Sequence, residues 1–577
     1  MESRVSMGIY IFFSSFLVLM SAIEVLLFLT SGGSSSSVLV LEFDWSFFGG
    51  FCCCTPVVVD WSSVIFSASV LSIAGGVMLF SCFYMDHEVF PIRFCYLVVL
   101  FVLFMNLLIF MPSILGMMVG WDGLGVVSFL LVVYYGNSES LGAGVITALS
   151  NRVGDALFIV LISLSVASMS WHFFDLNSVW PSYLVGLLVL ASMTKSAQVP
   201  FSAWLPAAMA APTPVSALVH SSTLVTAGVY VLFRFHMCIQ GAWGGLLGGV
   251  AMMTLILAGL SASVENDMKK IVAFSTLSQL GMMMLALSLD LKNVCFFHLI
   301  THAFFKALMF LCVGAIIYMG AGLQDLRLFG SLWSKMPNVC SWLVVSCMSL
   351  VGVPFMAGFY SKDLIVEGLV FNGSSFFMGA TMFFSVFLTA FYSTRFFLCA
   401  GIQRGWVSME SYSDCNVFLL MSLFMLGSGA IFAGVVLQGS VLMLNSFVWV
   451  PGSLKVLTLS CIVGGVLASL TVEKFLHFRS LSGTPTQPKN FFGLMMFLPI
   501  LTGQVTSGAV LSVSLETSLF LEKGWVESFV MKNVMWSAQS QGKAVISFLQ
   551  SGRGMGWVLF GVLGAALWAV FFWGCIT

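Results

Sequence analysis

Runs of about twenty apolar residues recur along this chain, and each is long enough to cross a membrane as a helix. Of the 577 residues, 59% are hydrophobic and only 8% are charged, whereas about 25% are charged in a typical soluble protein. At about 20 residues per span plus short connections, this length accommodates one large helical bundle. The sequence therefore predicts an all-α polytopic membrane protein with about 15 to 16 transmembrane helices.

The predicted spans are separated by short polar or glycine-rich connections. They are Gly8–Thr30, Val57–Tyr84, Phe94–Met111, Ser113–Tyr135, Gly142–Met169, Tyr183–Val199, Pro214–Phe235, Ala242–Ala262, Lys269–Ser288, Val294–Met319, Ser341–Val353, Ser374–Cys399, Val417–Leu437, Val456–Val472, Phe491–Val510 and Gly556–Cys575. The first connection contains Leu-Glu-Phe-Asp-Trp-Ser at residues 41–46, and its alternation favours a surface hairpin.

The segment from Leu511 to Arg553 differs from the spans on either side of it. Seven charged residues are interleaved there with Leu, Phe, Val and Trp, and no proline interrupts them. An ordinary long loop would not carry such apolar periodicity. The pattern therefore predicts an amphipathic helix that lies along the membrane rather than across it.

A lysine coincides with a helix break after the apolar run that ends near Ala191. Lys195 is followed closely by Pro200 and Pro206, and proline removes a backbone donor and disrupts a helix. Irregular backbone at membrane depth persists only where protein or a water-filled cavity surrounds it. Lys195 could be an interfacial lysine near the end of a span, but an ionisable residue at such a break indicates function.

A second lysine, Lys362, follows a similar interruption at Val351-Gly-Val-Pro-Phe-Met-Ala-Gly. Alone, Lys362 and Asp363 could form an ion pair in a loop. Two broken helices that carry lysines in separate parts of the chain are instead typical of transporters built from inverted repeats, whose site lies near the midplane of the membrane.

Asp122, Arg152, Asp155 and His220 are further ionisable residues inside predicted spans. Asp122 has no polar neighbour in sequence that could pair with it. Arg152 and Asp155 are three residues apart on one helix face, so they could neutralise each other in a structural pair or serve function. His220 could be a satisfied core histidine or a member of a proton relay.

The strongest local pattern is His298, His302 and Lys306, because spacings of four place all three on one stripe of a helix. The two histidines could bind zinc, but the glutamate of the H-E-x-x-H arrangement is missing. Titratable groups about 6 Å apart along a helix are what a hydrated proton path requires.

No dinucleotide fingerprint, metal-spaced cysteine cluster or haem motif occurs in the sequence. Cys52–Cys54 are adjacent, which suits neither metal spacing nor a simple disulfide, so we assign them no chemistry. The net charge of −1 provides no basic surface, so nucleic acid is not an expected partner.

Several segments resemble the subunit 5 family of NADH:ubiquinone oxidoreductase, respiratory complex I. The resemblance covers about residues 57–367 and rests on residues 151–155 (Asn-Arg-Val-Gly-Asp), 207–230, 266–281 (Asn-Asp-Met-Lys-Lys-Ile to Gly), 298–306 and 358–363 (Gly-Phe-Tyr-Ser-Lys-Asp). It implies inverted five-helix repeats with broken helices at Lys195 and Lys362, then a lateral helix and a closing anchor. The implied domains are 1–90 (N-terminal helices), 91–400 (antiporter-like core), 401–510 (further spans) and 511–577 (lateral helix and anchor).

The resemblance also implies a role for each matching position. Lys195 resembles the central proton-carrying lysine, and Lys362 resembles the lysine of the exit half-channel. The polar axis between them corresponds to Asp155, His220, His298, His302 and Lys306. Where the family usually has glutamate after Gly-Trp, this chain has Asp122, so the acid partner of Lys195 is retained with one methylene fewer.

The resemblance implies a proton-translocating membrane subunit with no cofactor of its own. NAD, FMN, Fe–S clusters and ubiquinone would belong to partner subunits, and the expected partners are the other membrane-arm subunits of complex I, membrane lipids and protons. The alternative is a subunit of an Mrp-type Na⁺/H⁺ antiporter, which shares this core. A purely structural scaffold is opposed by the stripe of His298, His302 and Lys306.

The expected location is the mitochondrial inner membrane, with multiple passes. The abundance of Phe, Val, Gly and Cys fits a T- and G-rich coding sequence of an organelle genome, and we find no Arg-rich presequence. Too few Lys and Arg flank the spans to fix the orientation.

Overall fold

The computed structural model describes residues 2–30, 38–45, 53–165, 180–239, 242–371, 376–402, 416–441, 451–478, 491–521, 523–525 and 533–550. The chain forms two compact units, Met1–Pro499 and Ile500–Thr577. The predicted closing span Gly556–Cys575 lies outside the described residues, and so does Cys52.

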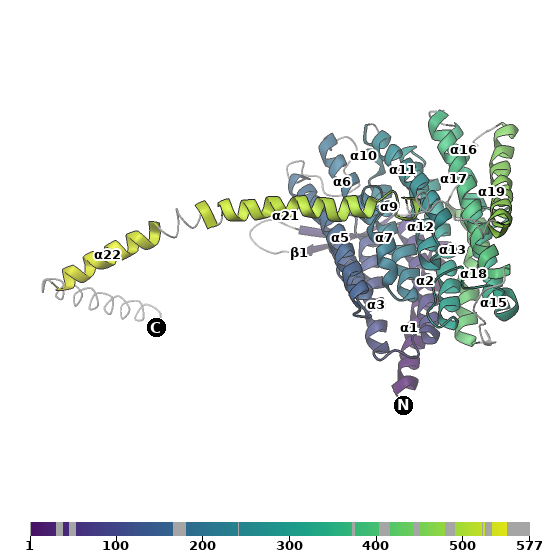
Figure 1. The fold of residues 1–577 in the computed structure, drawn as a ribbon, viewed down its shortest axis with the longest axis horizontal. Helices are drawn as coiled ribbons and strands as arrows, with labels where there is room; N and C mark the ends of the chain where they lie inside the picture. The colour runs from purple at the N-terminus through teal and green to yellow at the C-terminus, as the bar shows by residue number, and fades with distance from the viewer. Residues whose placement is uncertain are drawn as a thin grey trace. The chain divides into compact units, whose positions relative to one another are not determined.

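The first unit is a helical bundle, and Figure 1 shows its long helices running side by side. Its elements up to the first break are α1 (Glu2–Thr30), β1 (Leu39–Trp45), β2 (Cys53–Val59), α2 (Trp61–Tyr84), α3 (Pro91–Phe110), α4 (Ile114–Val132), α5 (Ser138–Ser165) and α6 (Ser182–Lys195). Those that follow are α7 (Trp204–Ala207), η2 (Ala208–Ala210), α8 (Thr213–Val215), η3 (Ser216–Thr223), α9 (Leu224–Arg234), α10 (His236–Ile239), α11 (Ala242–Val264), α12 (Met268–Ser288), α13 (Lys292–Met319), α14 (Leu332–Lys335), α15 (Pro337–Val351), α16 (Ala357–Phe371), α17 (Phe376–Phe397), η4 (Leu398–Ile402), α18 (Val417–Val441) and α19 (Gly452–Phe478).

The helices confirm the predicted all-α polytopic class. Among the described residues, twelve helices are long and apolar enough to cross a membrane, and α6 and α15 are shorter apolar helices. The central element is α13, whose residues are almost all buried and which packs against α2, α12, α15, α16 and α18. The stripe predicted from the sequence therefore lies in the middle of the bundle.

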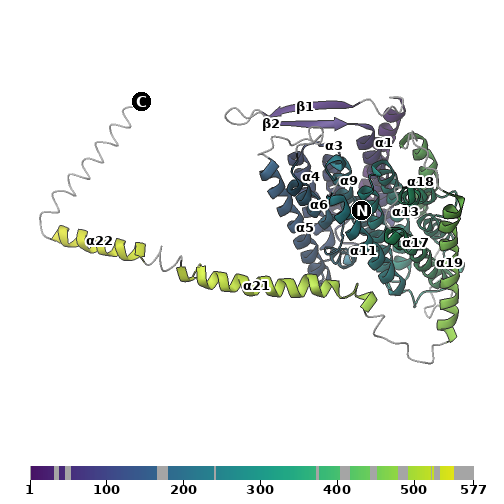
Figure 2. The ribbon, with the colours of Figure 1, turned by 90° about the horizontal axis from the view of Figure 1, so that it is seen from above.

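A two-stranded hairpin precedes α2, as the alternation at residues 41–46 predicts. β1 pairs antiparallel with β2, with Leu39 opposite Val59, and Figure 2 shows the two strands side by side. The prediction that a span begins at Val57 is wrong, because residues 53–59 form the second strand. The helix begins only after Asp60, whose carboxylate accepts from the backbone N–H of Ser63 in a capping box.

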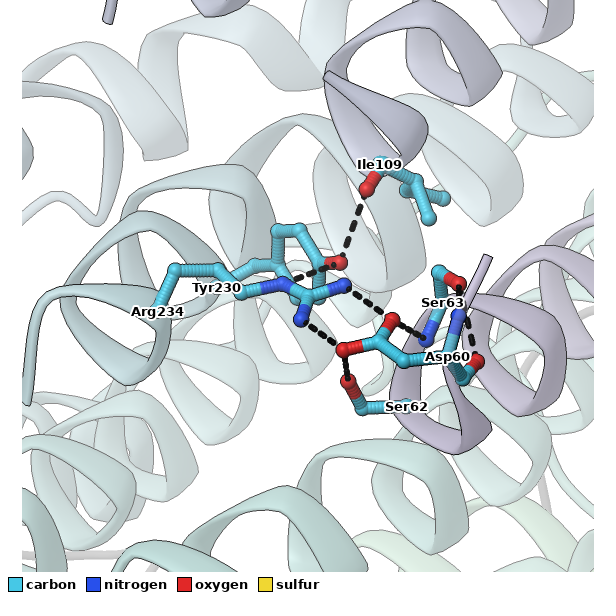
Figure 3. Close-up of polar contacts among 6 residues, drawn as sticks. All are labelled: Asp60, Ser62, Ser63, Ile109, Tyr230 and Arg234. Carbon is cyan, nitrogen blue, oxygen red and sulfur yellow. Dashed lines mark hydrogen bonds and ion pairs between the residues drawn. The ribbon is translucent and has the colours of Figure 1, made fainter. Parts of the chain in front are cut away.

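A buried ion pair joins the ends of three helices (Figure 3). The Nη1 and Nη2 atoms of Arg234, at the end of α9, lie 2.5 and 2.9 Å from the carboxylate of Asp60 before α2. Arg234 Nε also donates to the hydroxyl of Tyr230, which donates in turn to the carbonyl of Ile109 in α3. Such bidentate geometry fixes the relative positions of α2, α3 and α9.

Both predicted breaks are present in the backbone. After α6, the chain turns through residues 196–203, with left-handed backbone at Ala197 (φ 53°), before the short helices α7, η2 and α8. The chain then passes through a π-helical segment, η3, into α9. The second break lies between α15 and α16, where Gly352 (φ 87°) and Phe355 (φ 71°) are left-handed.

Close packing beside both breaks depends on glycine. A Cβ added at Gly358 of α16 would lie 1.8 Å from the carbonyl oxygen of Ser349 in α15. A Cβ at Gly228 of α9 would lie 2.6 Å from the carbonyl oxygen of Ser192 in α6. Any side chain there would push the broken helices apart, so these glycines let them pack directly against their neighbours.

Two sequence-based span assignments are wrong. Residues 491–510 do not form one span, because left-handed backbone at Met495, Met496 and Phe497 turns the chain after a short helical segment. The predicted spans include no range for α16, although a broken helix at Lys362 was expected, because its 15 residues include charged side chains and it follows directly on a break.

The second unit contains helices within and near the segment from Leu511 to Arg553. They are a π-helical turn, η5 (Ile500–Val505), and the helices α21 (Thr506–Thr517) and α22 (Asn533–Gln550). Helix formation is therefore confirmed for the described part of this segment. That the segment lies along the membrane stays a prediction.

Candidate functional site

Lys195, the last residue of α6, lies completely inside the bundle. Its Nζ donates to the carbonyl oxygen of Trp121 in α4 at 2.5 Å and lies 3.9 Å from the centroid of the same indole ring. An ammonium over an indole face is stabilised by the negative charge of the ring. The break after α6 thus leaves a buried amine held by a carbonyl oxygen and an aromatic face.

Carboxylates reach Lys195 indirectly, through Trp121. The indole Nε1 donates to Asp155 Oδ1 at 2.9 Å, and Asp155 Oδ2 lies 3.1 Å from Arg152 Nη1. The predicted pairing of Arg152 with Asp155 is confirmed. Asp155 is buried. The pair therefore places a carboxylate against Trp121, whose carbonyl accepts from Lys195.

The expectation that Asp122 is the acid partner of Lys195 is not met by a direct ion pair. Among the described residues, no carboxylate oxygen lies within 4.0 Å of Lys195 Nζ. Asp122 instead lies 4.0 Å from Arg152 Nη1, and its side chain is 39% exposed. The reason is the geometry of α4, which directs the carbonyl of Trp121 toward Lys195 and the side chain of Asp122 toward Arg152 in α5.

His220 lies in the π-helical segment η3 and is buried. Neither ring nitrogen has a hydrogen-bond partner within the described part of the chain. Its ring centroid lies 6.1 Å from that of Trp204, whose Nε1 donates to the carbonyl of Thr194, the residue before Lys195. A buried polar group without a protein partner is costly, so the site suits a group that exchanges protons with water.

The stripe on α13 is confirmed as buried, and each end is hydrogen-bonded to another helix. His298 contacts Ser361 Oγ through Nδ1 at 2.9 Å and Gln279 Oε1 through Nε2 at 3.2 Å. Lys306 Nζ donates to Ser275 Oγ at 2.6 Å.

His302 lies between these two ends of the stripe. Its ring centroid is 6.2 Å from that of His298, and both of its ring nitrogens lack a partner among the described residues. No group of three potential metal ligands occurs in the described ranges.

Lys362 is held at the second break. Its Nζ donates to Thr389 Oγ1 in α17 at 2.8 Å, and the carbonyls of Leu350 and Val351 lie 3.4 Å away. These carbonyls belong to the last turn of α15, where helix carbonyls are unpaired and the helix dipole is negative. Lys362 is therefore in a helix and not in a loop ion pair, and Ser361 beside it contacts His298.

Sequence reasoning missed the residues that hold the titratable groups. Trp121 stands beside Asp122 in the Gly-Trp-Asp motif, and Ser275 and Gln279 lie in the Ser-Thr-Leu-Ser-Gln segment, so a signal existed for these three. Ser361 lies in the Gly-Phe-Tyr-Ser-Lys-Asp segment, so the same signal existed for it, whereas Thr389 carries no pattern that would single it out.

In the part of the chain that the structure describes, the hydrogen-bond acceptors of three buried amines are thus neutral oxygen atoms; these are the amines of Lys195, Lys306 and Lys362. A permanent isolated charge at such depth would cost several kcal/mol. The arrangement can pass a proton between fixed donors and acceptors.

Comparison with known proteins identifies the family. Residues 112–389 match the family model described as "NADH:quinone oxidoreductase/Mrp antiporter, TM", and residues 392–572 match "NADH dehydrogenase subunit 5 C-terminus". The NADH-ubiquinone oxidoreductase chain 5 of Lumbricus terrestris is 41% identical over 504 residues, which cover 85% of this chain and 87% of the relative. The chain belongs to the NADH-ubiquinone oxidoreductase chain 5 family.

Other chain 5 proteins agree with this assignment. Those of Anopheles gambiae and Mytilus edulis are 42% and 39% identical, and cover 82% and 87% of this chain and 82% and 89% of the relatives. The resemblance to the chain 5 family is thus confirmed. As a member of that family, the chain is a subunit of an H⁺-translocating oxidoreductase.

Solved structures show that the fold of this chain 5 protein is antiporter-like. The Mrp complex of a Dietzia species superposes with a TM-score of 0.72 at 21% identity, over 94% of this chain and 63% of that one. An archaeal membrane-bound sulfane sulfur reductase superposes with a TM-score of 0.70 at 18% identity, over 94% and 99%. At these identities, the likeness concerns the fold alone.

Proposed function

We propose that this chain conducts protons along the buried titratable residues of its bundle. The observation that carries the proposal is the set of three buried lysines with neutral acceptors, one of which, Lys306, belongs to the stripe of α13. The proposed stations are Asp122, Asp155, Lys195, His220, His298, His302, Lys306 and Lys362.

The contacts support a path with two ends. At one end, Asp155 and Lys195 share Trp121, and at the other, His298 contacts Ser361, the residue before Lys362. The segment η3 packs against α13, so His220 lies on an element that adjoins the stripe. Groups that can gain and lose protons inside a membrane bundle are typical of proton relays.

Chain 5 membership makes the protein a proton-pumping membrane-arm subunit of NADH-ubiquinone oxidoreductase. Electrons pass through other subunits, which would hold NAD, FMN, Fe–S clusters and ubiquinone. The alternative, a subunit of an Mrp-type antiporter, shares the fold and the model matched at 112–389. The match of 392–572 to the C-terminus of subunit 5 favours the oxidoreductase.

The chain is a multi-pass membrane protein, and its animal relatives favour the mitochondrial inner membrane. Its partners would be the other membrane-arm subunits, because the fold neighbours are parts of multi-subunit membrane complexes. Copurification with an NADH-oxidising assembly would support this placement. Sodium-dependent growth rescue without such an assembly would support the Mrp alternative.

Replacing Lys195 tests proton conduction. Lys195→Met removes the amine and should abolish proton translocation, and Lys195→Arg should impair it because a guanidinium hardly deprotonates. The measurement is the ratio of protons pumped to electrons transferred by the complex in vesicles, with assembly checked by its partners. Lys543→Met, an exposed lysine of α22, is the control. A wild-type ratio in Lys195→Met would refute the proposed path.

We also propose that the segment from Leu511 to Arg553 braces neighbouring subunits along the membrane. Its charges would be costly in a span, and described residues of α21 and α22 present exposed apolar side chains such as Leu511, Val513 and Trp536. Truncation from Gly524 onward should impair assembly of the complex. Normal assembly and pumping after that truncation would contradict the bracing role.

A further inference from the structure

A fourth lysine, Lys269, is buried in the bundle and has no assigned role. It is the second residue of α12, and its side chain is almost completely covered. Its Nζ donates to one acceptor, the carbonyl oxygen of Ala211, at 3.2 Å. No ion pair joins Lys269 to a carboxylate in the part of the chain that the structure describes.

The geometry of Lys269 repeats that of Lys195 and Lys362. In all three cases, a buried amine donates to a backbone carbonyl, and either the lysine or that carbonyl lies beside an interruption of a helix. The acceptor Ala211 ends the short helix η2 and precedes Pro212. Lys269 thus adjoins the broken segment that continues into η3 and His220.

Helix electrostatics do not explain a lysine at this position. The first turn of a helix carries a positive partial charge, which destabilises a cation there relative to a neutral group. A neutral donor could satisfy the carbonyl of Ala211 without that destabilisation. A titratable amine at the site therefore points to a requirement other than capping.

Lys269 is slightly more exposed than the other buried lysines, at 5% against 0–2% for Lys195, Lys306 and Lys362. The residue after it, Lys270, has a side chain that is 45% exposed and forms an ion pair with Asp267, which is 35% exposed. The backbone at Asp267 also bridges to Asp325 in the connection after α13. The amine of Lys269 therefore lies just inside the edge of the bundle that is open to the surface.

On its inner side, Lys269 adjoins two groups of stations. Both η2 and η3 pack against α12, and η3 carries Ser216 and His220. Along α12 itself, Thr276 lies seven residues, or about 10 Å, further on the same face. The residue before it, Ser275, accepts the hydrogen bond from Lys306.

We propose that Lys269 is a proton-carrying residue that connects the surface of the bundle with the buried path at the segment of His220. In this role, Nζ takes up a proton from water on one side and releases it to the buried path on the other. The carbonyl of Ala211 only positions the amine. The inference rests on the proposed function.

The test compares Lys269→Arg, Lys269→Gln and Lys195→Met in the complete complex, in vesicles. Arginine and glutamine both keep a donor for Ala211, but neither releases a proton readily. When proton-carrying residues act in series, loss of any one of them blocks the path. The ratio of protons pumped to electrons transferred should therefore fall in Lys269→Arg as far as in Lys195→Met. The matched controls are Lys270→Arg and Lys270→Gln, which should pump at the wild-type ratio.

Each other outcome counts against the inference. If Lys269→Arg pumps at the wild-type ratio while Lys195→Met does not, Lys269 only caps a carbonyl. That result would refute this inference and leave the proposed path unaffected. If neither Lys269→Arg nor Lys269→Gln assembles, the lysine is structural and the inference falls as well. If Lys195→Met itself pumps normally, the proposed path falls and this inference falls with it.

Discussion

Each of the two helix breaks of this chain 5 protein holds a buried lysine amine, but the groups that hold the amine differ between them. Lys195 ends α6, and the amine of Lys362 lies at the end of α15, so each is placed where a helix dipole is negative. At Lys195, however, an indole connects the amine to the buried carboxylate of Asp155. At Lys362, the hydrogen-bond partners among the described residues are Thr389 and two backbone carbonyls.

This difference indicates at which break the charge of the lysine can depend on a neighbouring ionisable group. The affinity of Lys195 for a proton depends on a carboxylate that is itself paired with Arg152, so movement of that pair would change it. The surroundings of Lys362 are fixed dipoles, which stay in place as long as α15 and α17 do. We therefore expect the first break to respond to neighbouring groups and the second to hold a constant environment.

The largest effect should come from removing the second amine. Lys362→Met should abolish pumping as completely as loss of Lys195 does, because it removes the amine that the carbonyl of Leu350 and the hydroxyl of Thr389 hold at that break. The ratio of protons to electrons in vesicles is the measurement. Lys455→Met, whose side chain is 51% exposed, is the control and should pump normally. Pumping by Lys362→Met would show that the two breaks are not equivalent stations.

A smaller effect should follow from neutralising Asp155. Asn can still accept from Trp121, but loss of a nearby charge changes the energy of an ammonium by about 1–4 kcal/mol. We expect Asp155→Asn to reduce pumping about tenfold or more. The control, Asp325→Asn, removes a largely exposed pair worth about 0–1 kcal/mol and should pump normally. Unchanged pumping by Asp155→Asn would remove the contrast between the two breaks.

Thr389→Val should have a moderate effect at the second break. The variant removes the hydroxyl closest to Lys362 and leaves two carbonyls, so we expect a loss of pumping of about three- to fivefold. Thr394→Val, on the same helix, removes a hydroxyl that contacts Ser469 and Ala390 instead and is the matched control. An equal loss in both variants would mean that α17 is only destabilised.

The smallest effect should be that of Asp122→Glu. The side chain is partly exposed and lies 4.0 Å from Arg152, so one more methylene can be accommodated without disturbing Lys195. Pumping at the wild-type ratio, measured as above, is the expected result. A strong loss would show that Asp122 sits closer to the path than its contacts indicate.

The sequence by itself determined the class of the protein and the positions of its key side chains. Apolar run length gives the spans, proline and glycine give the two breaks, and spacings of four place His298, His302 and Lys306 on one stripe. All of these are local properties, because helix periodicity and backbone breaks depend on residues within a few positions of one another. Helix ends were less accurate, as at Val57 and Phe491–Val510, where a strand and a left-handed turn replace apolar helix.

Only the tertiary structure decided which groups hold the lysines. The acceptor for Lys195 lies 74 residues away in sequence, and the hydroxyl for Lys362 lies 27 residues away on another helix. The same packing places Asp122 against Arg152 and leaves Lys269 beside Ala211. Such partners follow from how helices pack and rotate against one another, and residue spacing along one helix contains no information about the helix that will face it.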